Sequence, residues 1–316
     1  MPTTFRGMIP PVVTPMRPDG SVDLESLDRL VDHLVVGGMN GLFVLGSSGQ
    51  VAYLTDEERD LVTARVVART AGRIPVVCGT PDMSARRVIE QGRRAAALGV
   101  DAIVVTAPVY SLNDSAEIAD HFRMVAEAVD VPVIAYDVPV RVRSKLGLDT
   151  LMGLAADGHI CAVKDSSGDD VGFRRLVAAN EAAGHPLDVL SGHEVMLDGI
   201  FLLGADGAVP GLANVDPAAY TRLWQAAERG DWAAAKAEQD RIAALFEIAF
   251  VPVGLSGDSG GIGAFKAALA SLGVIDSGAM PAPLRPLPDD ALARIDEILG
   301  SVGLLGAPAL DGALAG

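Results

Sequence analysis

The sequence has few of the features that mark several common protein classes. Cysteine is nearly absent: only Cys78 and Cys161 occur, each inside an apolar run, which argues against a disulfide framework or a thiolate metal site. Positive charge is also scarce, with 25 Lys and Arg against 41 Asp and Glu and a formal net charge of -16. No run of Lys or Arg forms a basic stripe, so we expect neither nucleic acid nor an anionic membrane surface as a partner.

Long hydrophobic runs and a leader pattern are missing as well. No segment approaches the roughly 18 apolar residues that span a membrane. The first residues, MPTTFRGMIPPVVTP, lack the charged-then-apolar layout of a signal peptide, and we therefore expect a cytoplasmic protein. Aromatic residues make up only 4% of the chain, but 50% of all residues are hydrophobic, which is enough for a sizeable core.

What the chain does contain is a regular series of strand-like runs in its first two thirds. Several of these runs are apolar at successive positions, as is typical of parallel strands that are covered on both faces. The eight candidate strands are residues 9–14, 41–45, 74–78, 102–106, 131–136, 160–164, 188–190 and 207–209.

Segments with helical periodicity lie between these runs. Thr55 and Glu58 have the spacing of a capping box, and the helix that they open should extend to about residue 70. Apolar stripes over 85–96 and 118–129 predict two further helices. Eight strand-helix units predict a (β/α)8 TIM barrel. An open doubly wound sheet is the alternative, although no GxGxxG fingerprint follows the first strand.

After residue 216 the strand pattern stops and only helical segments follow. They cover 217–228, 231–248, about 262–272 and 288–299, and the first of them fits as the eighth barrel helix. We therefore predict a catalytic barrel domain over residues 1–229 and a C-terminal helical region over 230–302. A Gly- and Ala-rich tail over 303–316 is expected to be flexible.

The residues that end each strand are candidates for the active site, because in such barrels the site lies at the C-terminal ends of the strands. Lys164 is the most informative, since the chain has only four lysines and this one closes an apolar run in the stretch AVKDSSGDD. An amine above an apolar floor favours its neutral form, which is a nucleophile toward a carbonyl carbon. An ordinary lysine paired with the neighbouring Asp165 is the alternative.

Other strand ends carry groups that fit carbonyl chemistry. The loop from Gly46 to Gly49 offers unobstructed backbone N–H groups and two hydroxyls, which suit a carboxylate, although such turns also occur without a ligand. Tyr136 ends the fifth strand and Tyr110 follows the fourth, and a phenol at either place can carry a proton or simply pack. Only His193 of the five histidines falls at a strand end, and no HxH or HxxxH pair exists, so no metal site is expected.

Four segments, taken together and in order, resemble the dihydrodipicolinate synthase / N-acetylneuraminate lyase family. GSSGQ at 46–50, YDVPVR at 136–141, KDSSG at 164–168 and SGHE at 191–194 are similar to its GTTGE, YNxPxR, KEATG and SGDD motifs. The resemblance covers about residues 5–275. It implies a class I lyase that works without metal or organic cofactor. Such an enzyme condenses pyruvate with an aldehyde, or cleaves or dehydrates a 2-oxo acid.

The resemblance also implies a role for each matched residue. Lys164 would form an imine with the 2-oxo carbon, and Tyr136 would move the proton in a relay with Ser47 and Tyr110. Tyr110 often serves the neighbouring subunit in this family, which implies a homodimer or a homotetramer. The substrate-binding positions would be Ser48, Gly49, Arg141, His193, Glu194 and Val209.

Departures from the family motifs affect the expected substrate. In this chain Gln50 stands where the family usually has glutamate, Asp137 where it has asparagine, and Val142 where it has threonine. His193 and Glu194 stand in place of two aspartates. Arg141 matches the arginine that holds the second substrate's carboxylate in synthase-type members. We expect a 2-oxo-3-deoxy sugar acid or a 4-hydroxy-2-oxo acid as substrate. The alternatives are 4-hydroxy-tetrahydrodipicolinate (dihydrodipicolinate) synthesis from pyruvate and aspartate semialdehyde, and a non-catalytic barrel that binds an oxo acid.

Overall fold

The computed structural model describes residues 4–305, and eight parallel strands form a single sheet in it. The sheet order is β1-β8-β7-β6-β5-β4-β3-β2. The strands are β1 (Gly7–Met8), β2 (Leu42–Val44), β3 (Val76–Gly79), β4 (Ala102–Thr106), β5 (Val133–Asp137), β6 (Ala162–Asp165), β7 (Asp188–Ser191) and β8 (Gly207–Ala208). The seam between β1 and β2 is closed just after β1, where the Phe43 N–H donates to the Pro10 carbonyl (3.0 Å) and the Val12 N–H donates to the Phe43 carbonyl (2.9 Å). The predicted (β/α)8 barrel is confirmed.

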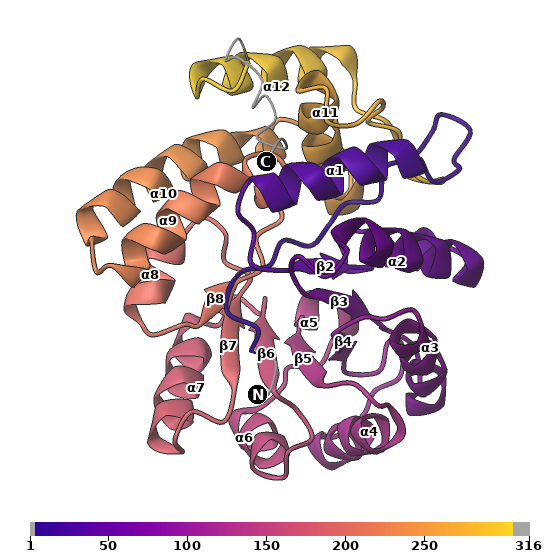
Figure 1. The fold of residues 1–316 in the computed structure, drawn as a ribbon, viewed down its shortest axis with the longest axis vertical. Helices are drawn as coiled ribbons and strands as arrows, with labels where there is room; N and C mark the ends of the chain where they lie inside the picture. The colour runs from indigo at the N-terminus through magenta and orange to yellow at the C-terminus, as the bar shows by residue number, and fades with distance from the viewer. Residues whose placement is uncertain (1–3, 306–316) are drawn as a thin grey trace.

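Helices alternate with the strands and surround them (Figure 1). Those of the barrel are α1 (Leu24–Val36), α2 (Asp56–Thr70), α3 (Ala85–Ala97), α4 (Ser115–Ala128), α5 (Pro139–Val142), α6 (Leu148–Ala156), α7 (Asp170–Ala182), α8 (Leu197–Leu202) and α9 (Pro217–Glu228). The capping box predicted at Thr55 is present: the Glu58 N–H donates to Thr55 Oγ1 (3.3 Å), and the Thr55 N–H donates to Glu58 Oε2 (2.8 Å).

The first strand lies earlier in the chain than predicted. Residues 9–14 do not form one strand, because Pro10 and Pro11 have no N–H to donate to a neighbouring strand. Instead Gly7 and Met8 pair with β8, and Pro11 makes only an isolated bridge to Phe43. The closing strand is therefore short, and its pairing with β8 covers two residues on each side.

Three more helices follow the barrel: α10 (Trp232–Phe246), α11 (Gly263–Ser271) and α12 (Asp289–Ser301). Helix α10 lies beside α8 and α9, and α11 and α12 lie together near α1 (Figure 1). A short π-helical turn, η4 (Asp258–Ile262), precedes α11. The predicted boundaries at residues 229 and 302 fall between α9 and α10 and after α12. Most of the tail predicted to be flexible, residues 306–316, lies outside the described residues.

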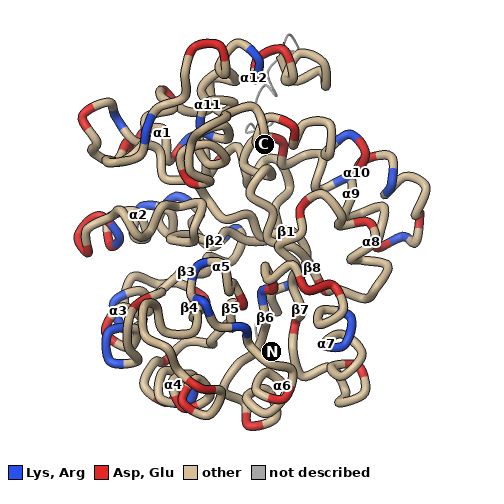
Figure 2. The backbone as a smooth tube through the Cα atoms, turned by 180° about the vertical axis from the view of Figure 1, so that it is seen from behind, with Lys and Arg blue, Asp and Glu red and all other residues tan. Residues whose placement is uncertain are grey.

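Most charged residues lie on the outer helices and loops, where Lys and Arg are interspersed with Asp and Glu (Figure 2). The barrel interior is apolar and includes Phe43, Val77, Val104, Ile134 and Leu190, all buried. Among residues 4–305 no helix is both long and apolar enough to cross a membrane.

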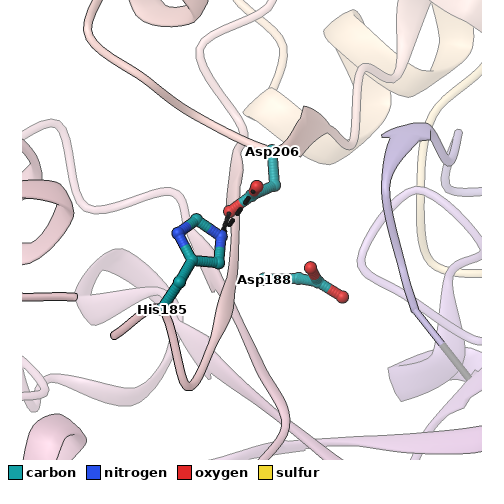
Figure 3. A group of neighbouring side chains, drawn as sticks. All are labelled: His185, Asp188 and Asp206. Atoms are coloured by element: carbon teal, nitrogen blue, oxygen red, sulfur yellow. Dashed lines mark hydrogen bonds and ion pairs between the residues drawn. The ribbon is translucent and has the colours of Figure 1, made fainter. Parts of the chain in front are cut away.

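A polar cluster lies at the N-terminal end of the barrel, where β7 and β8 begin (Figure 3). The Asp206 carboxylate lies 3.0 Å from His185 Nε2, accepts the Val189 N–H (2.9 Å) and pairs with Arg6 (3.2 Å). The neighbouring Asp188 accepts the N–H of Phe5 (2.7 Å). These contacts join the chain that leads into β1 to the two adjacent strands, so the cluster stabilises the closure of the barrel.

Candidate active site

The amine of Lys164 is enclosed near the C-terminal end of β6. Lys164 is 5% exposed, and its Nζ lies 4.1 Å from the ring centroid of Tyr136 and 4.9 Å from that of Phe43. The register of the sheet explains the first contact, because Tyr136 on β5 is the direct partner of Lys164. Beneath the amine lies a narrow apolar layer that includes Val209, which was predicted to bind substrate.

The alternative interpretation of Lys164, an ordinary lysine paired with Asp165, does not match the structure. One oxygen of Asp165 accepts the N–H of Ser167 (2.7 Å), and the other lies 3.6 Å from the Nζ of Lys145. Among residues 4–305 no carboxylate lies within 4.0 Å of the Lys164 amine. An enclosed amine without a carboxylate partner remains available to a carbonyl substrate.

Tyr136 has an electrostatic environment that favours its ionised form. Burial raises the pKa of Tyr136, but the charge of Lys164 and hydrogen bonding with Ser166, Lys164 and Ser47 outweigh burial and lower the pKa below its usual value. A phenol with a lowered pKa gives up and accepts a proton more readily near neutral pH. The structure therefore brings together three of the predicted residues, namely Lys164, Tyr136 and Ser47.

The loop over residues 46–50 follows β2 and reaches the same region. It is bounded by two residues in the left-handed region, Leu45 (φ 55°) and Gln50 (φ 59°), and the carbonyl of Gly49 accepts a hydrogen bond from Thr14 Oγ1 (2.7 Å). A side chain at position 46 would lie 2.9 Å from the ring of Phe43, which explains why glycine begins the loop. Ser47 and Ser48 are half-buried, but only Ser47 lines the adjacent cavity.

A cavity of about 370 Å³ opens from Tyr136 toward the end of β5 and the loop after α10. Its lining includes Ser47, Tyr53, Thr106, Tyr136, Arg141 and Asp258. Arg141, from α5, forms an ion pair with Asp258, in which Nη1 lies 3.1 Å from one carboxylate oxygen and Nη2 contacts the other. Hydrogen bonding to Asp258 raises the pKa of Arg141, which keeps the guanidinium charged.

His193 and Glu194 lie on the loop after β7 and do not line that cavity. The carboxylate of Glu194 accepts the N–H of Leu212 (2.7 Å). Burial raises the pKa of Glu194 to about 7, although the N–H groups of Leu212 and Gly211 and the charge of Lys164 act in the opposite direction. His193 is half-buried, with its Nε2 3.7 Å from Asp170.

Tyr110 is not brought to the site within one chain. It is 89% exposed, has a backbone φ of 75° and does not line the cavity. Within a single copy of the chain, Tyr110 therefore does not reach the cavity that Tyr136 lines.

Sequence reasoning missed the roles of Lys145 and Asp258. Lys145 lies in a polar loop of the sequence, but it forms an ion pair with Asp137, which is fully buried. The signal was available, because Asp137 replaces an asparagine in the motif and a buried carboxylate requires a partner. Asp258 gave no such signal, since 117 residues separate it from Arg141.

An enclosed amine lies against the ring of a phenol that lines a cavity, at the C-terminal ends of barrel strands. This arrangement is suited to imine formation with a carbonyl substrate. Fold and site thus define a class of protein, the lyases that work through a Schiff base. The comparison with protein families is more specific: the chain belongs to the dihydrodipicolinate synthetase family, whose model matches residues 4–301.

Individual relatives agree with this assignment. The chain is 34% identical over 309 residues to an uncharacterized DapA-like lyase of Halobacterium salinarum, with 96% of each chain covered. It is 36% identical over 305 residues to the 4-hydroxy-tetrahydrodipicolinate synthase of Thioalkalivibrio sulfidiphilus, covering 95% of this chain and 98% of the relative. The dihydrodipicolinate synthase from Acinetobacter baumannii complexed with pyruvate superposes with a TM-score of 0.87 at 32% identity, covering 96% of this chain and 100% of that one.

Membership in this family confirms the prediction of a class I lyase. Its enzymes use an imine between pyruvate and a lysine and need no external cofactor. This membership establishes the class of enzyme. The relatives differ in name within that class, since one is called a lyase and another a synthase.

Proposed function

We propose that this protein is a class I aldolase or dehydratase that forms an imine between Lys164 and a pyruvate-derived 2-oxo acid. Its substrate in this proposal is a 2-oxo-3-deoxy sugar acid or a related 4-hydroxy-2-oxo acid. The observation that carries the proposal is the position of the Lys164 amine, which is enclosed, lacks a carboxylate partner and lies 4.1 Å from the ring centroid of Tyr136.

The chemistry requires one nucleophile and one group that moves protons. Once it has given up its proton, the amine of Lys164 attacks the 2-oxo carbon, a C–N bond forms, the carbonyl C–O bond breaks, and the oxygen leaves as water. The protonated imine then accepts the electron pair released when a proton leaves the adjacent carbon or when the C3–C4 bond breaks. Tyr136 is the proton carrier in this proposal, and its lowered pKa supports the role.

The remaining residues bind and position the substrate in this proposal. Ser47 relays protons with Tyr136, while Ser48 and the backbone N–H of Gly49 hold the pyruvyl carboxylate. Val209 forms part of the apolar floor, and His193 and Glu194 contact hydroxyl groups of the substrate. Because Tyr110 is exposed in one chain, its place in the relay requires a second copy, and we include a homodimer or a homotetramer in the proposal.

Synthesis of 4-hydroxy-tetrahydrodipicolinate is the second candidate. Arg141 lines the cavity, and a guanidinium is suited to a second carboxylate such as that of aspartate semialdehyde. Relatives that carry the name of this synthase also support it. The ion pair of Arg141 with Asp258 and the departures at Gln50 and Asp137 favour the sugar-acid substrate instead.

The imine can be tested directly by incubating the protein with pyruvate and sodium borohydride, followed by intact-mass and peptide mass spectrometry. We expect a reduced adduct on Lys164 that is absent in Lys164→Ala. Lys236→Ala is the matched control, because Lys236 is an exposed lysine that pairs with Asp240, and this variant should give the wild-type adduct. Folded protein without an adduct would overturn the proposal in favour of a barrel that only binds an oxo acid.

A substrate panel tests the second part of the proposal. Cleavage or dehydration of 2-oxo-3-deoxy sugar acids should be faster, in kcat/KM, than condensation of pyruvate with aspartate semialdehyde. If the condensation is faster, the sugar-acid assignment is wrong and the synthase is the function of this chain.

A further inference from the structure

The far end of the cavity carries an ion pair that joins two distant parts of the chain. Arg141 lies on α5, directly after β5, and Asp258 begins the π-helical turn η4 in front of α11. The side chain of Asp258 is 17% exposed and that of Arg141 45% exposed, and both line the cavity of about 370 Å³. The Tyr53 hydroxyl also donates to Asp258 (3.3 Å), so the carboxylate is held from two sides.

The turn that carries Asp258 is itself fixed by hydrogen bonds. The N–H of Ser259 donates to Ser256 Oγ (3.2 Å), and the hydroxyl of Ser259 accepts the N–H of Arg285 (3.2 Å). Arg285 in turn donates to the carbonyl of Gly254 (2.7 Å). Asp258 is therefore presented to Arg141 by a segment with its own internal support.

The ion pair places one positive and one negative charge at this end of the cavity, so Asp258 neutralises Arg141. A guanidinium binds a carboxylate best through two parallel N–H groups, and Asp258 already occupies both nitrogens of that fork. A second carboxylate on the substrate would have to displace Asp258 or use the remaining N–H groups of Arg141, and in either case it would be repelled by Asp258. A neutral tail with hydroxyl groups meets neither cost and finds donors and acceptors in Arg141, Asp258 and Tyr53.

We propose that Asp258 is a specificity-determining residue: by occupying Arg141, it selects substrates whose tail is neutral and hydroxylated over substrates whose tail carries a carboxylate. This inference rests on the proposed function, because it concerns the tail of a molecule bound covalently at Lys164. Asp258 acts through Arg141 and through the charge of the cavity, and takes no part in the imine chemistry.

The test compares two aldehydes of similar length in condensation with pyruvate, succinic semialdehyde with a carboxylate tail and butanal with a neutral one. Asp258→Asn should raise the ratio of kcat/KM for succinic semialdehyde over butanal about tenfold, the order expected for one unit charge in a partly screened site. The change should lie mainly in KM, because the reacting atoms are untouched. An aldehyde without measurable turnover is compared by its Kd on the borohydride-reduced pyruvyl enzyme, where the same tenfold change is expected.

Two controls separate charge selection from a structural effect. Asp276→Asn also removes one carboxylate from the C-terminal region, where Asp276 pairs with Arg29 of α1. This variant should leave the ratio of kcat/KM for the two aldehydes unchanged. In an Arg141→Ala background, Asp258→Asn should favour the carboxylated aldehyde much less, because only the repulsion by Asp258 is then removed and no guanidinium is released. An equal change for both aldehydes, or an effect of the same size without Arg141, would overturn the inference.

Failure of the inference is distinguishable from failure of the proposed function. If wild-type protein and Asp258→Asn both form the borohydride-trapped adduct on Lys164 while the ratio stays constant, the inference alone is wrong. If neither forms the adduct, the imine proposal fails first and the inference falls with it.

Discussion

At the scale of single residues, Glu194 predicts a pH dependence of stability. Burial raises the pKa of Glu194 from 4.5 to about 7 in the folded protein. Between these values the folded state keeps a proton that the unfolded state has released, so the free energy of unfolding should fall as the pH rises from about 4.5 to 7. Glu194→Gln should remove this contribution, because an amide still accepts the N–H of Leu212 but does not ionise. Urea unfolding of both proteins from pH 4.5 to 8 measures the difference.

The control is Glu228→Gln, at an exposed position that ends α9. The difference in stability between this variant and the wild type should stay constant over the same pH range. A constant difference between Glu194→Gln and the wild type would contradict the assignment of a raised pKa to Glu194.

The residues that could be predicted from sequence are those whose position follows from a strand end. Lys164 and Tyr136 close apolar runs, and the parallel register of β5 and β6 then brings them together. The pair of Arg141 with Asp258 could not be predicted, because it depends on how a glycine-rich segment after α10 folds back over the barrel. Tyr110 shows a third case, since it is exposed in a single chain and makes none of its predicted contacts there.

At the scale of elements, Lys266 connects helix α11 to the loop after β2. It is fully buried, and its Nζ donates to Gln50 Oε1 (2.9 Å) and to the carbonyl of Ala279 (2.8 Å). Because neither partner is charged, burial lowers the pKa of Lys266 from 10.5 to about 7. The unfolded state therefore binds a proton that the folded state lacks between these pH values, and stability should rise with pH by up to about 1.4 kcal/mol per unit over this range.

Lys266→Met tests this connection, since methionine fills a similar volume without a charge. The variant should lose the rise in stability between about pH 7 and 10 that the wild type shows, as measured by urea unfolding. Lys236→Met, at an exposed lysine on α10, should keep the wild-type slope. Parallel pH profiles for the wild type and Lys266→Met would mean that the buried amine stays charged.

The elements that sequence reasoning located well are those whose ends are fixed by local chemistry. The capping box at Thr55 and Glu58 defines the start of α2, and the predicted helix over 217–228 is the observed α9. The first strand was misplaced because its apolar pattern continues through Pro10 and Pro11, where the backbone has no N–H groups to donate. Periodicity reports which residues are buried, whereas strand pairing also depends on donors and on the register of the partner.

At the scale of the whole molecule, stability depends on the closure of the barrel between β1 and β8. That pairing covers only two residues on each strand, and the cluster around Asp206 reinforces it by binding Arg6, His185 and the Val189 N–H. Asp206→Asn removes the charge from a buried group with three partners, and we expect a loss of about 2–3 kcal/mol in the free energy of unfolding. Circular dichroism and tryptophan fluorescence during urea unfolding should show one coincident transition at a lower midpoint, because the seam joins the two ends of a single sheet.

The exposed ion pair of Lys236 with Asp240 provides a matched comparison for that loss. Asp240→Asn also removes one paired aspartate, but both partners are exposed, so the expected cost is about 0–1 kcal/mol. Both variants should still form the pyruvate adduct, since Asp206 lies at the end of the barrel opposite to Lys164. Equal losses for the two variants would show that the short seam between β1 and β8 closes without help from the cluster. A loss of the adduct in Asp206→Asn alone, with the fold retained, would show instead that closure at the N-terminal end controls the geometry of the catalytic end.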